Sequence, residues 1–385
     1  MNKLIRITTV SISLNKLLEG QLAFMKQYYE VIAVSSDNQA LKKVGKKEGI
    51  RTVCIEMTRK ITPIHDLKAL WKLYRFLKKE KPLIVHTHTP KAGTVGMIAA
   101  WLANVPNRIH TVAGLPLMET GGGKRKLLDI VEKITYRCST LVLPNSYGLK
   151  DIILKEKLCK LSKLKVIANG SSNGINTSYF DPTLFSDIQR GNLKNELGIK
   201  DTDFVFIFVG RIVKDKGVNE LVNAFEEISK RYKNIKLLLV GPLEPHLDPL
   251  KKDTLGKINN NTNIIAVGFQ SDVRPYFAIS DVLAFPSYRE GFPNAVMQAG
   301  AMGLPSIVTD INGCNEIIED GVNGLIIPSK NREALEEKME LLLTDKELLA
   351  KLRDNARDKI ISRYEQYMVW EALLSEYKSL ENRNV

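Results

Sequence analysis

The chain has 385 residues, of which 44% are hydrophobic and 26% charged; this composition excludes disordered and fibrous proteins, and the length predicts two domains. Its 56 Lys and Arg against 43 Asp and Glu give a net charge of +13, which favours an anionic partner such as nucleic acid, phospholipid or a phosphorylated substrate. No apolar stretch reaches the roughly 20 residues of a membrane helix, and no signal peptide is recognisable. The four cysteines form no close pair and no CxxC motif. We therefore expect a soluble, reduced protein of the cytoplasm.

Short β-branched runs alternate with amphipathic stretches along the first half of the chain. The strands predicted there are Leu4–Val10, Tyr29–Val34, Thr52–Ile55, Leu83–Thr87, Arg108–Val112, Thr140–Leu143 and Lys165–Ala168. Among the stretches between them, Leu67–Lys79 is predicted to be a helix, because its apolar residues recur at intervals of three and four.

The second half repeats this alternation after a polar break at Thr177–Gly198. Its predicted strands are Asp203–Val209, Ile235–Val240, Asn263–Val267, Val282–Phe285, Ser306–Thr309 and Leu325–Ile327. Most are continuous apolar runs, as in parallel sheets that are covered on both faces. A helical segment from Arg332 to Leu380 follows. The pattern predicts two doubly wound α/β domains, residues 1–185 and 186–365, whose ligands bind beyond the carboxyl ends of the strands.

Charge is divided unequally between the halves. Residues 1–185 hold 30 Lys and Arg against 13 Asp and Glu, a net of +17, whereas residues 186–385 hold 26 against 30, a net of −4. The first half should therefore meet something anionic. The alternative is a lysine-rich surface that is merely solvated.

The first candidate site is the loop Gly210-Arg211-Ile212-Val213-Lys214-Asp215-Lys216-Gly217, between a buried strand and a helix predicted at about Val218–Ser229. Glycine lets a ligand approach the backbone, and the free amides of a helix start attract anions. Arg211 and Lys216 add two cations. The loop predicts a diphosphate site, although basic loops before helices are also common without one.

The second candidate site is Glu290-Gly291-Phe292-Pro293-Asn294, which follows another predicted strand and opens a helix. Glu290 at the end of a strand can accept hydrogen bonds from ligand hydroxyls, and the amides of Gly291, Phe292 and Asn294 can bind an anion. Gln298 lies one helical turn further on. The alternative is a surface turn with a capping acid.

Together, GRxxxxKG, EGFPN and Gly303-Leu304-Pro305-Ser306-Ile307-Val308 resemble the donor half of glycosyltransferase family 4. This resemblance covers essentially the whole chain. It implies a retaining, nucleotide-sugar-dependent enzyme of the GT-B fold, with two Rossmann-like domains facing across a cleft. It also implies that a final helix, at about residues 366–385, returns to pack on the first domain.

The resemblance also implies roles for particular residues. Arg211 and Lys216, with Gly210 beside them, would neutralise the donor diphosphate, and Glu290 would accept hydrogen bonds from the donor sugar. The turn containing Phe269 would border the base. No metal ion or other cofactor is implied, because preorganised cations and amides stabilise the leaving group while the acceptor hydroxyl attacks from the same face.

Two positions depart from the family pattern. Gln298 stands where the family commonly has a second acid that grips the ribose hydroxyls, so ribose binding is retained without the charge. Related enzymes often have a Gly-Gly turn after the first strand, whereas this chain has only Gly20 there; Gly20 could still let the diphosphate approach.

Histidines end two strands of the first half. His86-Thr87-His88 could bind zinc, but no third ligand is evident. His88 or Lys91 near the acceptor, and His110 on the donor sugar as the resemblance implies, are the functional interpretations. The alternatives are loop packing for the first pair and a structural strand histidine for His110.

Cations and aromatic residues share the segment around Trp71, which is typical of a helix that lies on a membrane surface, and Gly121–Lys126 adds three cations. A lipid-linked acceptor would need such a face. The alternative is that Trp71 packs on the sheet. We expect a peripheral enzyme at the inner face of the membrane.

The sequence thus favours transfer of a hexose or N-acetylhexosamine from a nucleotide diphosphate sugar, with a UDP-sugar as the expected donor, to a polyprenyl-diphosphate-linked or other saccharide in capsule, O-antigen or exopolysaccharide assembly. A nucleotide-sugar epimerase on the same fold is one alternative. A basic nucleic-acid-binding protein is another, although no helix-turn-helix, zinc finger or RNP pattern is present.

Overall fold

The computed structural model describes residues 1–58, 62–115, 117, 121–246 and 248–382. The chain forms two compact units: unit 1 is Met1–Gly174 with Gln366–Val385, and unit 2 is Ile175–Glu365. The first crossing between them lies at residue 174, earlier than the predicted boundary at 185. The reason is local, because the backbone N–H of Ile175 donates to Tyr364 O at 2.8 Å and Phe180 packs in the core of unit 2.

Unit 1 contains six parallel strands in the order β3-β2-β1-β4-β5-β6. Their bounds are β1 Lys3–Val10, β2 Glu30–Ser36, β3 Arg51–Cys54, β4 Ile84–His88, β5 Asn107–Val112 and β6 Leu141–Pro144. The predicted strand Lys165–Ala168 is wrong. Only Leu164 forms a bridge, to Val142 of β6, and the chain then turns away with Ala168 at a positive φ of 48°.

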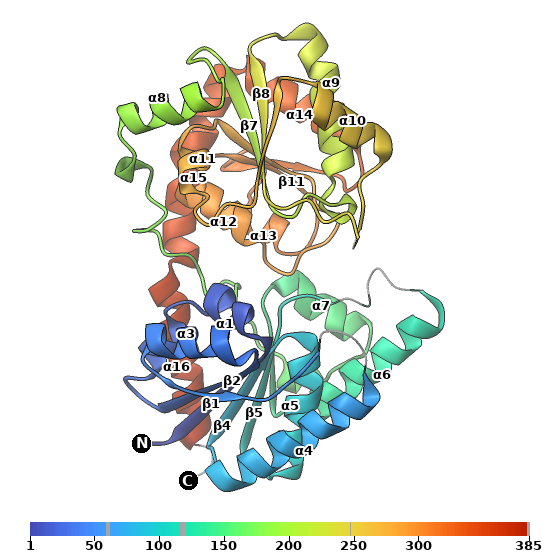
Figure 1. The fold of residues 1–385 in the computed structure, drawn as a ribbon, viewed down its shortest axis with the longest axis vertical. Helices are drawn as coiled ribbons and strands as arrows, with labels where there is room; N and C mark the ends of the chain where they lie inside the picture. The colour runs from blue at the N-terminus through green and yellow to red at the C-terminus, as the bar shows by residue number, and fades with distance from the viewer. Residues whose placement is uncertain (59–61, 116, 118–120, 247, 383–385) are drawn as a thin grey trace. The chain divides into compact units, whose positions relative to one another are not determined.

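Helices cover both faces of this sheet (Figure 1). They are α1 Ser11–Leu17, α2 Gln21–Met25, α3 Asn38–Glu48, α4 Pro63–Glu80, α5 Pro90–Leu102, α6 Gly122–Cys138, α7 Tyr147–Lys155 and α16 Gln366–Asn382. The connections through α4, α5 and α6 all advance from β3 toward β6, whereas those through α1, α2 and α3 run the other way. Right-handed crossovers therefore place α4, α5 and α6 together on one face.

Unit 2 repeats the topology, with strand order β12-β11-β10-β7-β8-β9. Its strands are β7 Phe204–Val209, β8 Ile235–Val240, β9 Ile264–Gly268, β10 Val282–Phe285, β11 Ser306–Thr309 and β12 Gly324–Ile327. Its helices are α8 Asp187–Glu196, α9 Val218–Arg231, α10 Lys252–Asn260, α11 Arg274–Ala278, α12 Asn294–Ala301, α13 Cys314–Ile317, α14 Arg332–Thr344 and α15 Lys346–Tyr364. All strands that were predicted here are present.

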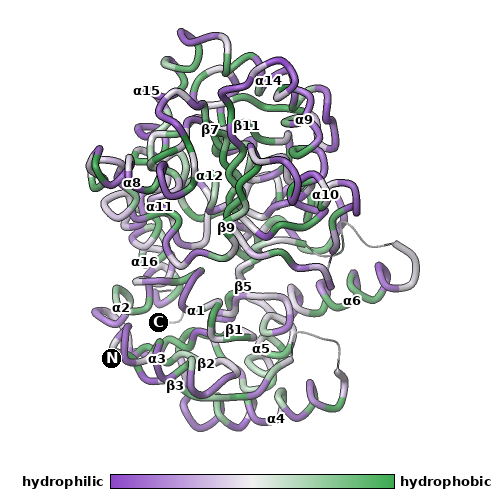
Figure 2. Tube along the Cα trace, turned by 45° about the horizontal axis from the view of Figure 1, so that its top comes forward, coloured by the Kyte–Doolittle hydropathy of each residue, from purple (hydrophilic) through white to green (hydrophobic). Residues whose placement is uncertain are grey.

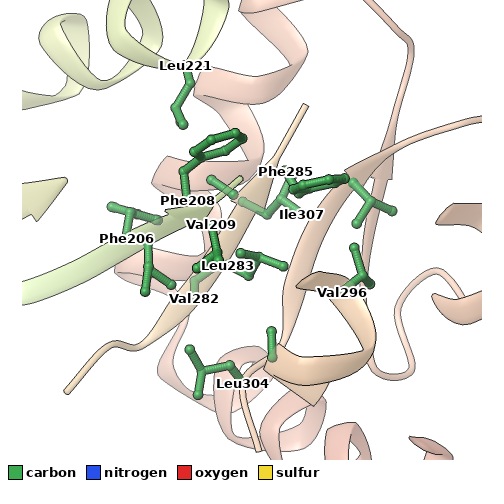
Figure 3. Close-up of a cluster of buried hydrophobic side chains, with 14 of the residues drawn as sticks. Phe206, Phe208, Val209, Leu221, Val282, Leu283, Phe285, Val296, Leu304 and Ile307 are labelled. Carbon is green, nitrogen blue, oxygen red and sulfur yellow. The ribbon is translucent and has the colours of Figure 1, made fainter. Parts of the chain in front are cut away.

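The core of unit 2 explains why its strands are uniformly apolar. Phe206, Phe208, Leu283 and Phe285 on the central strands β7 and β10 are at most 3% exposed (Figure 3). The rings of Phe208 and Phe285 stack with centroids 5.9 Å apart. Because both faces of this sheet are buried, the strands cannot alternate polar and apolar residues.

The predicted polar break contains a helix. Ser186 and Gln189 form a reciprocal capping box that starts α8, in which no residue is buried. The spacing Ser-x-x-Gln is typical of a helix N-terminus, but an interpretation based on the polar composition of the segment does not detect it. The long helical segment after Arg332 is in fact three helices, α14, α15 and α16.

Helix α16 completes unit 1, as the resemblance implies. Its buried residues Leu373, Leu374, Tyr377 and Leu380 belong to the same hydrophobic cluster as residues of β1 and β2. Among the described residues, no helix combines the length and the apolar character that crossing a bilayer needs.

Candidate functional site

The loop between β7 and α9 is shaped by a close approach of backbone. Gly217 has a φ of +69°, and a Cβ there would lie 2.0 Å from Pro286 O, in the loop that follows β10. Only glycine fits such a position. Because β7 and β10 are neighbours in a parallel sheet, their carboxyl ends meet at the same edge, and Gly217 lets the two loops touch.

This contact brings two predicted site residues together. Lys216 Nζ lies 2.5 Å from Glu290 Oε1, and each side chain is 15% exposed. The neighbouring backbone is also connected, since Tyr288 N–H donates to Asp215 O at 2.9 Å, while Asn312 Nδ2 donates to Glu290 O at 2.5 Å. The Lys216–Glu290 pair is thus held in place from both sides.

Arg211 pairs with an acid that the sequence reading missed. Its Nη1 lies 2.9 Å from Glu244 Oε2, on the loop after β8. Three contacts join this loop to the Arg211 loop: Ile212 N–H donates to Pro242 O at 2.8 Å, Asp215 N–H donates to Asp248 Oδ2 at 2.6 Å, and Gly241 lies against Gly210 O. Strands β7 and β8 are also neighbours, so sheet order was the signal that could have revealed Glu244.

The remaining donor-side residues lie around this edge of unit 2. Gly291 and Phe292 precede α12, but the Phe292 ring packs on Tyr364, with centroids 5.3 Å apart, so only its backbone is free to serve a ligand. Asn294 is exposed at the first position of α12 and Gln298 is half-buried one turn later. Phe269 follows β9 and is 68% exposed, which suits an aromatic surface for a ligand base.

The two histidines of β4 are buried within unit 1. His86 and His88 face α16: the ring nitrogens of His86 lie 2.5 Å from Tyr377 Oη and 2.7 Å from Thr111 Oγ1, and His88 Nε2 lies 2.8 Å from Arg6 Nη2. Since the Arg6 guanidinium can only donate, His88 Nε2 accepts. Burial lowers the pKa of both histidines well below the usual value, and the neighbouring cation adds to this effect.

Arg6 itself is fully buried, and its hydrogen-bonding partners in the described structure are the neutral groups of Tyr377, Gln21 and His88. The adjoining cavity has a volume of about 20 Å³, which is room for one water molecule rather than a sugar. This cluster therefore fixes α16 to the sheet.

Three other predicted positions also have structural partners. His110 lies under α5 with its Nδ1 2.8 Å from Thr87 Oγ1, and burial lowers its pKa to about 4. Gly20 faces Trp370, whose ring would lie 2.7 Å from a Cβ, and its N–H donates to Glu48. Lys91 pairs with Asp66 at the start of α4.

Two six-stranded parallel sheets, each in a doubly wound unit, form the architecture of GT-B glycosyltransferases. Residues 189–359 match the family "Glycosyl transferases group 1", and residues 15–146 match "Glycosyl transferase 4-like". The chain belongs to the group 1 glycosyltransferases of family GT4, and it is an enzyme of that class.

The chain is 36% identical to the capsular polysaccharide biosynthesis glycosyltransferase CapM of Staphylococcus aureus, over 98% of this chain and 97% of that protein. It is 33% identical to the UDP-Gal:alpha-D-GlcNAc-diphosphoundecaprenol alpha-1,3-galactosyltransferase of Escherichia coli, over 81% and 78% of the two chains. The fold is similar to HepE of Anabaena, solved in complex with UDP and glucose, with a TM-score of 0.82 and 18% identity over 98% and 100% of the chains.

Proposed function

We propose that this enzyme transfers a hexose or N-acetylhexosamine, with retention, from a UDP-sugar to a polyprenyl-diphosphate-linked saccharide in the assembly of a surface polysaccharide. The observation that carries the proposal is the Lys216–Glu290 pair at the edge of the second sheet, with Arg211 on the same loop as Lys216. The names of the capsular relative and of the undecaprenol-dependent relative support the acceptor class.

In this proposal, Arg211 and Lys216 bind the two phosphates of the donor, and their charge stabilises the diphosphate as the bond to the sugar breaks. Glu290 exchanges part of its contact with Lys216 for hydroxyl groups of the sugar. The acceptor hydroxyl attacks the same face of the oxocarbenium-like sugar and passes its proton to an oxygen of the departing diphosphate. No metal ion is required, because the two side chains supply the positive charge.

Supporting roles follow the same geometry. The amides of Gly291, Phe292 and Asn294 serve the sugar or a phosphate, Gln298 contacts the ribose, and the exposed ring of Phe269 borders the base. On the acceptor side, His88, Lys91 and His110 are already engaged within unit 1, so we assign them the task of shaping that unit rather than contacting substrate.

We further propose peripheral contact with the anionic inner face of the membrane, where a lipid-linked acceptor would be reached. The positive charge of the first half supports this, since anionic lipids attract clustered lysines and arginines.

The donor assignment is tested by thermal shift with UDP-, GDP- and ADP-sugars. A UDP-sugar at about 100 times its Kd should raise the Tm of unit 2 by roughly 5–10 °C. The absence of stabilisation by any nucleotide sugar would contradict the proposal. Transfer to a polyprenyl-diphosphate-linked saccharide should persist in EDTA, and the donor incubated alone should be recovered without epimerisation.

A further inference from the structure

Two pairs of adjacent charged residues face each other at the carboxyl edge of the second sheet. Strand β7 is hydrophobic along its length (Figure 2), so charged side chains begin only in the loop that follows it. In that loop Asp215 precedes Lys216, and in the loop after β10 Arg289 precedes Glu290. Because the order of charges is reversed between the two loops, two neighbouring ion pairs can form. One of them, Lys216 with Glu290, belongs to the candidate donor site.

The other ion pair joins Arg289 to Asp215. Arg289 Nη2 lies 2.9 Å from Asp215 Oδ2, and the two side chains are 41% and 17% exposed. Asp215 is also held through its backbone, since its N–H donates to Asp248 and its carbonyl accepts from the N–H of Tyr288. The loop after β10 has a further anchor, because the Tyr288 hydroxyl donates to Glu220 of α9 at 2.6 Å. The Asp215–Arg289 pair therefore joins two loops that are both anchored elsewhere in unit 2.

Only half of the possible contact between these two side chains is formed. A guanidinium can donate two parallel hydrogen bonds to one carboxylate, here through Nε and Nη2. Nη2 of Arg289 is bonded, but Arg289 Nε and Asp215 Oδ1 are buried atoms without a hydrogen-bond partner among the described residues. Buried polar atoms without a partner are unfavourable. A movement that brings Nε to Oδ1 would therefore strengthen the pair.

Donor binding gives this second pair a task. In the proposed function, Lys216 contacts a phosphate and Glu290 contacts hydroxyl groups of the sugar, so these two side chains hold each other less tightly. The two loops then lose part of the ion pair that joins them beside the ligand. The proposed function assigns neither Asp215 nor Arg289 to the donor, and they are the adjacent residues of the same two loops. Their pair can therefore keep the loops together while the donor is bound.

Two other roles for this pair have to be distinguished. Arg289 could bind the donor directly as a third cation, but Asp215 already neutralises its charge and occupies Nη2. In that case only Arg289 would matter for turnover, and removal of the Asp215 charge would not lower it. Alternatively, the pair could serve the fold alone, so that its loss would lower the Tm and leave transfer unchanged.

We propose that Asp215 and Arg289 are positioning residues for sugar transfer. Their second hydrogen bond forms when the donor draws Lys216 and Glu290 apart, and the completed pair keeps these two groups at the separation that the reaction needs. The inference rests on the proposed function, because that function assigns Lys216 and Glu290 to the donor.

The test is a double-mutant cycle with Asp215→Asn, Arg289→Gln and the double variant. The kcat and KM are measured as UDP release from the UDP-sugar that stabilises the wild type most, and the Tm is measured beside them. Each single variant should lower kcat about tenfold, because small misplacements of reacting groups are costly, and should change KM less than about twofold, since Arg211 and the backbone amides remain. The double variant should lose no more than either single variant, because all three remove the same pair.

Arg289→Lys separates positioning from fold stability. Lysine retains one bond to Asp215, so the Tm should stay within about 2 °C of the wild type. It cannot form two parallel bonds to a carboxylate, so kcat should still fall about fivefold or more. The matched control is Arg353→Lys, in another Arg–Asp pair of unit 2, where Arg353 and Asp281 are 46% and 30% exposed. Asp281 directly precedes β10, at the opposite edge of the sheet, so this control should keep the wild-type kcat.

Four results would overturn the proposal: additive losses in the double variant, normal kcat in Asp215→Asn, normal kcat in Arg289→Lys, or an equal loss in Arg353→Lys. A loss in Arg289→Gln alone would make Arg289 a direct donor contact. If Lys216→Ala is inactive while the variants at Asp215 and Arg289 keep the wild-type kcat, the positioning role fails and the proposed function stands. If the wild type binds no UDP-sugar, the proposed function itself fails.

Discussion

At the scale of single residues, Lys216 and Glu290 form an ion pair with each other, and both side chains are largely shielded from water. We predict that Lys216→Ala lowers kcat for transfer by about 100-fold or more, because a preorganised donor at a developing charge typically contributes that much. The measurement is steady-state turnover with a UDP-sugar.

The matched control for this variant is Lys214→Ala, an exposed lysine of the same loop that has no acid partner among the described residues. It should keep near-normal turnover. The Tm of both variants should stay within a few degrees of the wild type. Turnover by Lys216→Ala at the wild-type rate would remove Lys216 from the mechanism.

The carboxylate of Glu244 forms an ion pair with the guanidinium of Arg211, so a diphosphate that binds Arg211 has to displace this carboxylate. Glu244→Gln should therefore tighten UDP binding about two- to fivefold, the usual size of a partly exposed ion pair. Calorimetric titration measures this change. Glu227→Gln, at an exposed pair with Lys230 on α9, is the control. If Glu244→Gln weakens UDP binding, Glu244 positions Arg211 instead of competing for it.

How far single residues could be predicted depends on whether they follow a strand. Arg211, Lys216 and Glu290 each follow a buried strand of a parallel sheet, and that placement alone predicted a shared edge. Glu244 was missed because its contact with Arg211 depends on which strand lies beside β7. The buried setting of His86 and His88 was missed because it depends on α16: His86 reaches Tyr377, which lies 291 residues further along the chain.

At the scale of elements, strands β4 and β5 carry three buried histidines whose pKa values are lowered by burial. A base with a folded pKa below its unfolded pKa binds fewer protons when folded, so stability is complete above pH 6.5 and is lost as the pH falls. His110, with a pKa of about 4, contributes on the order of 3 kcal/mol of this loss. Glu132 acts in the opposite direction, because burial raises its pKa, but it is one group against three.

We therefore predict that the denaturant midpoint of unit 1 decreases steadily between pH 6.5 and pH 4. All three tryptophans, Trp71, Trp101 and Trp370, lie in unit 1, so tryptophan fluorescence follows this unit selectively. His110→Gln should flatten the slope, whereas His65→Gln, at an exposed position of α4, should leave it unchanged. A midpoint that is constant or increases over this interval would contradict the assignment.

Elements with one dominant signal were predicted well. The apolar runs of β8, β10 and β11 matched residue for residue, because only a strand buried on both faces has that composition. Lys165–Ala168 is β-branched in part but lies at the rim of the sheet, where a single bridge replaces a ladder. Helix α8 buries nothing, so periodicity could not reveal it, and only its cap was informative.

At the scale of the whole molecule, two units with one strand order carry opposite charge. The sequence predicted both the duplication and the asymmetry, because strand alternation and charge are summed over many residues. The net charge of each half could not show on which surface of the folded unit the positive charge is concentrated. That required the crossovers that bring α4, α5 and α6, with their exposed lysines and arginines, onto one face of the first sheet.

Helix α16 belongs to unit 1 in space but is the last described segment of the chain. During translation, every residue of unit 2 is therefore polymerised before the Tyr377 hydroxyl is available to the buried Arg6 guanidinium. Part of the core of unit 1 therefore stays uncovered until the ribosome has synthesised the whole of unit 2. Order of synthesis and order of completion are thus inverted in this protein.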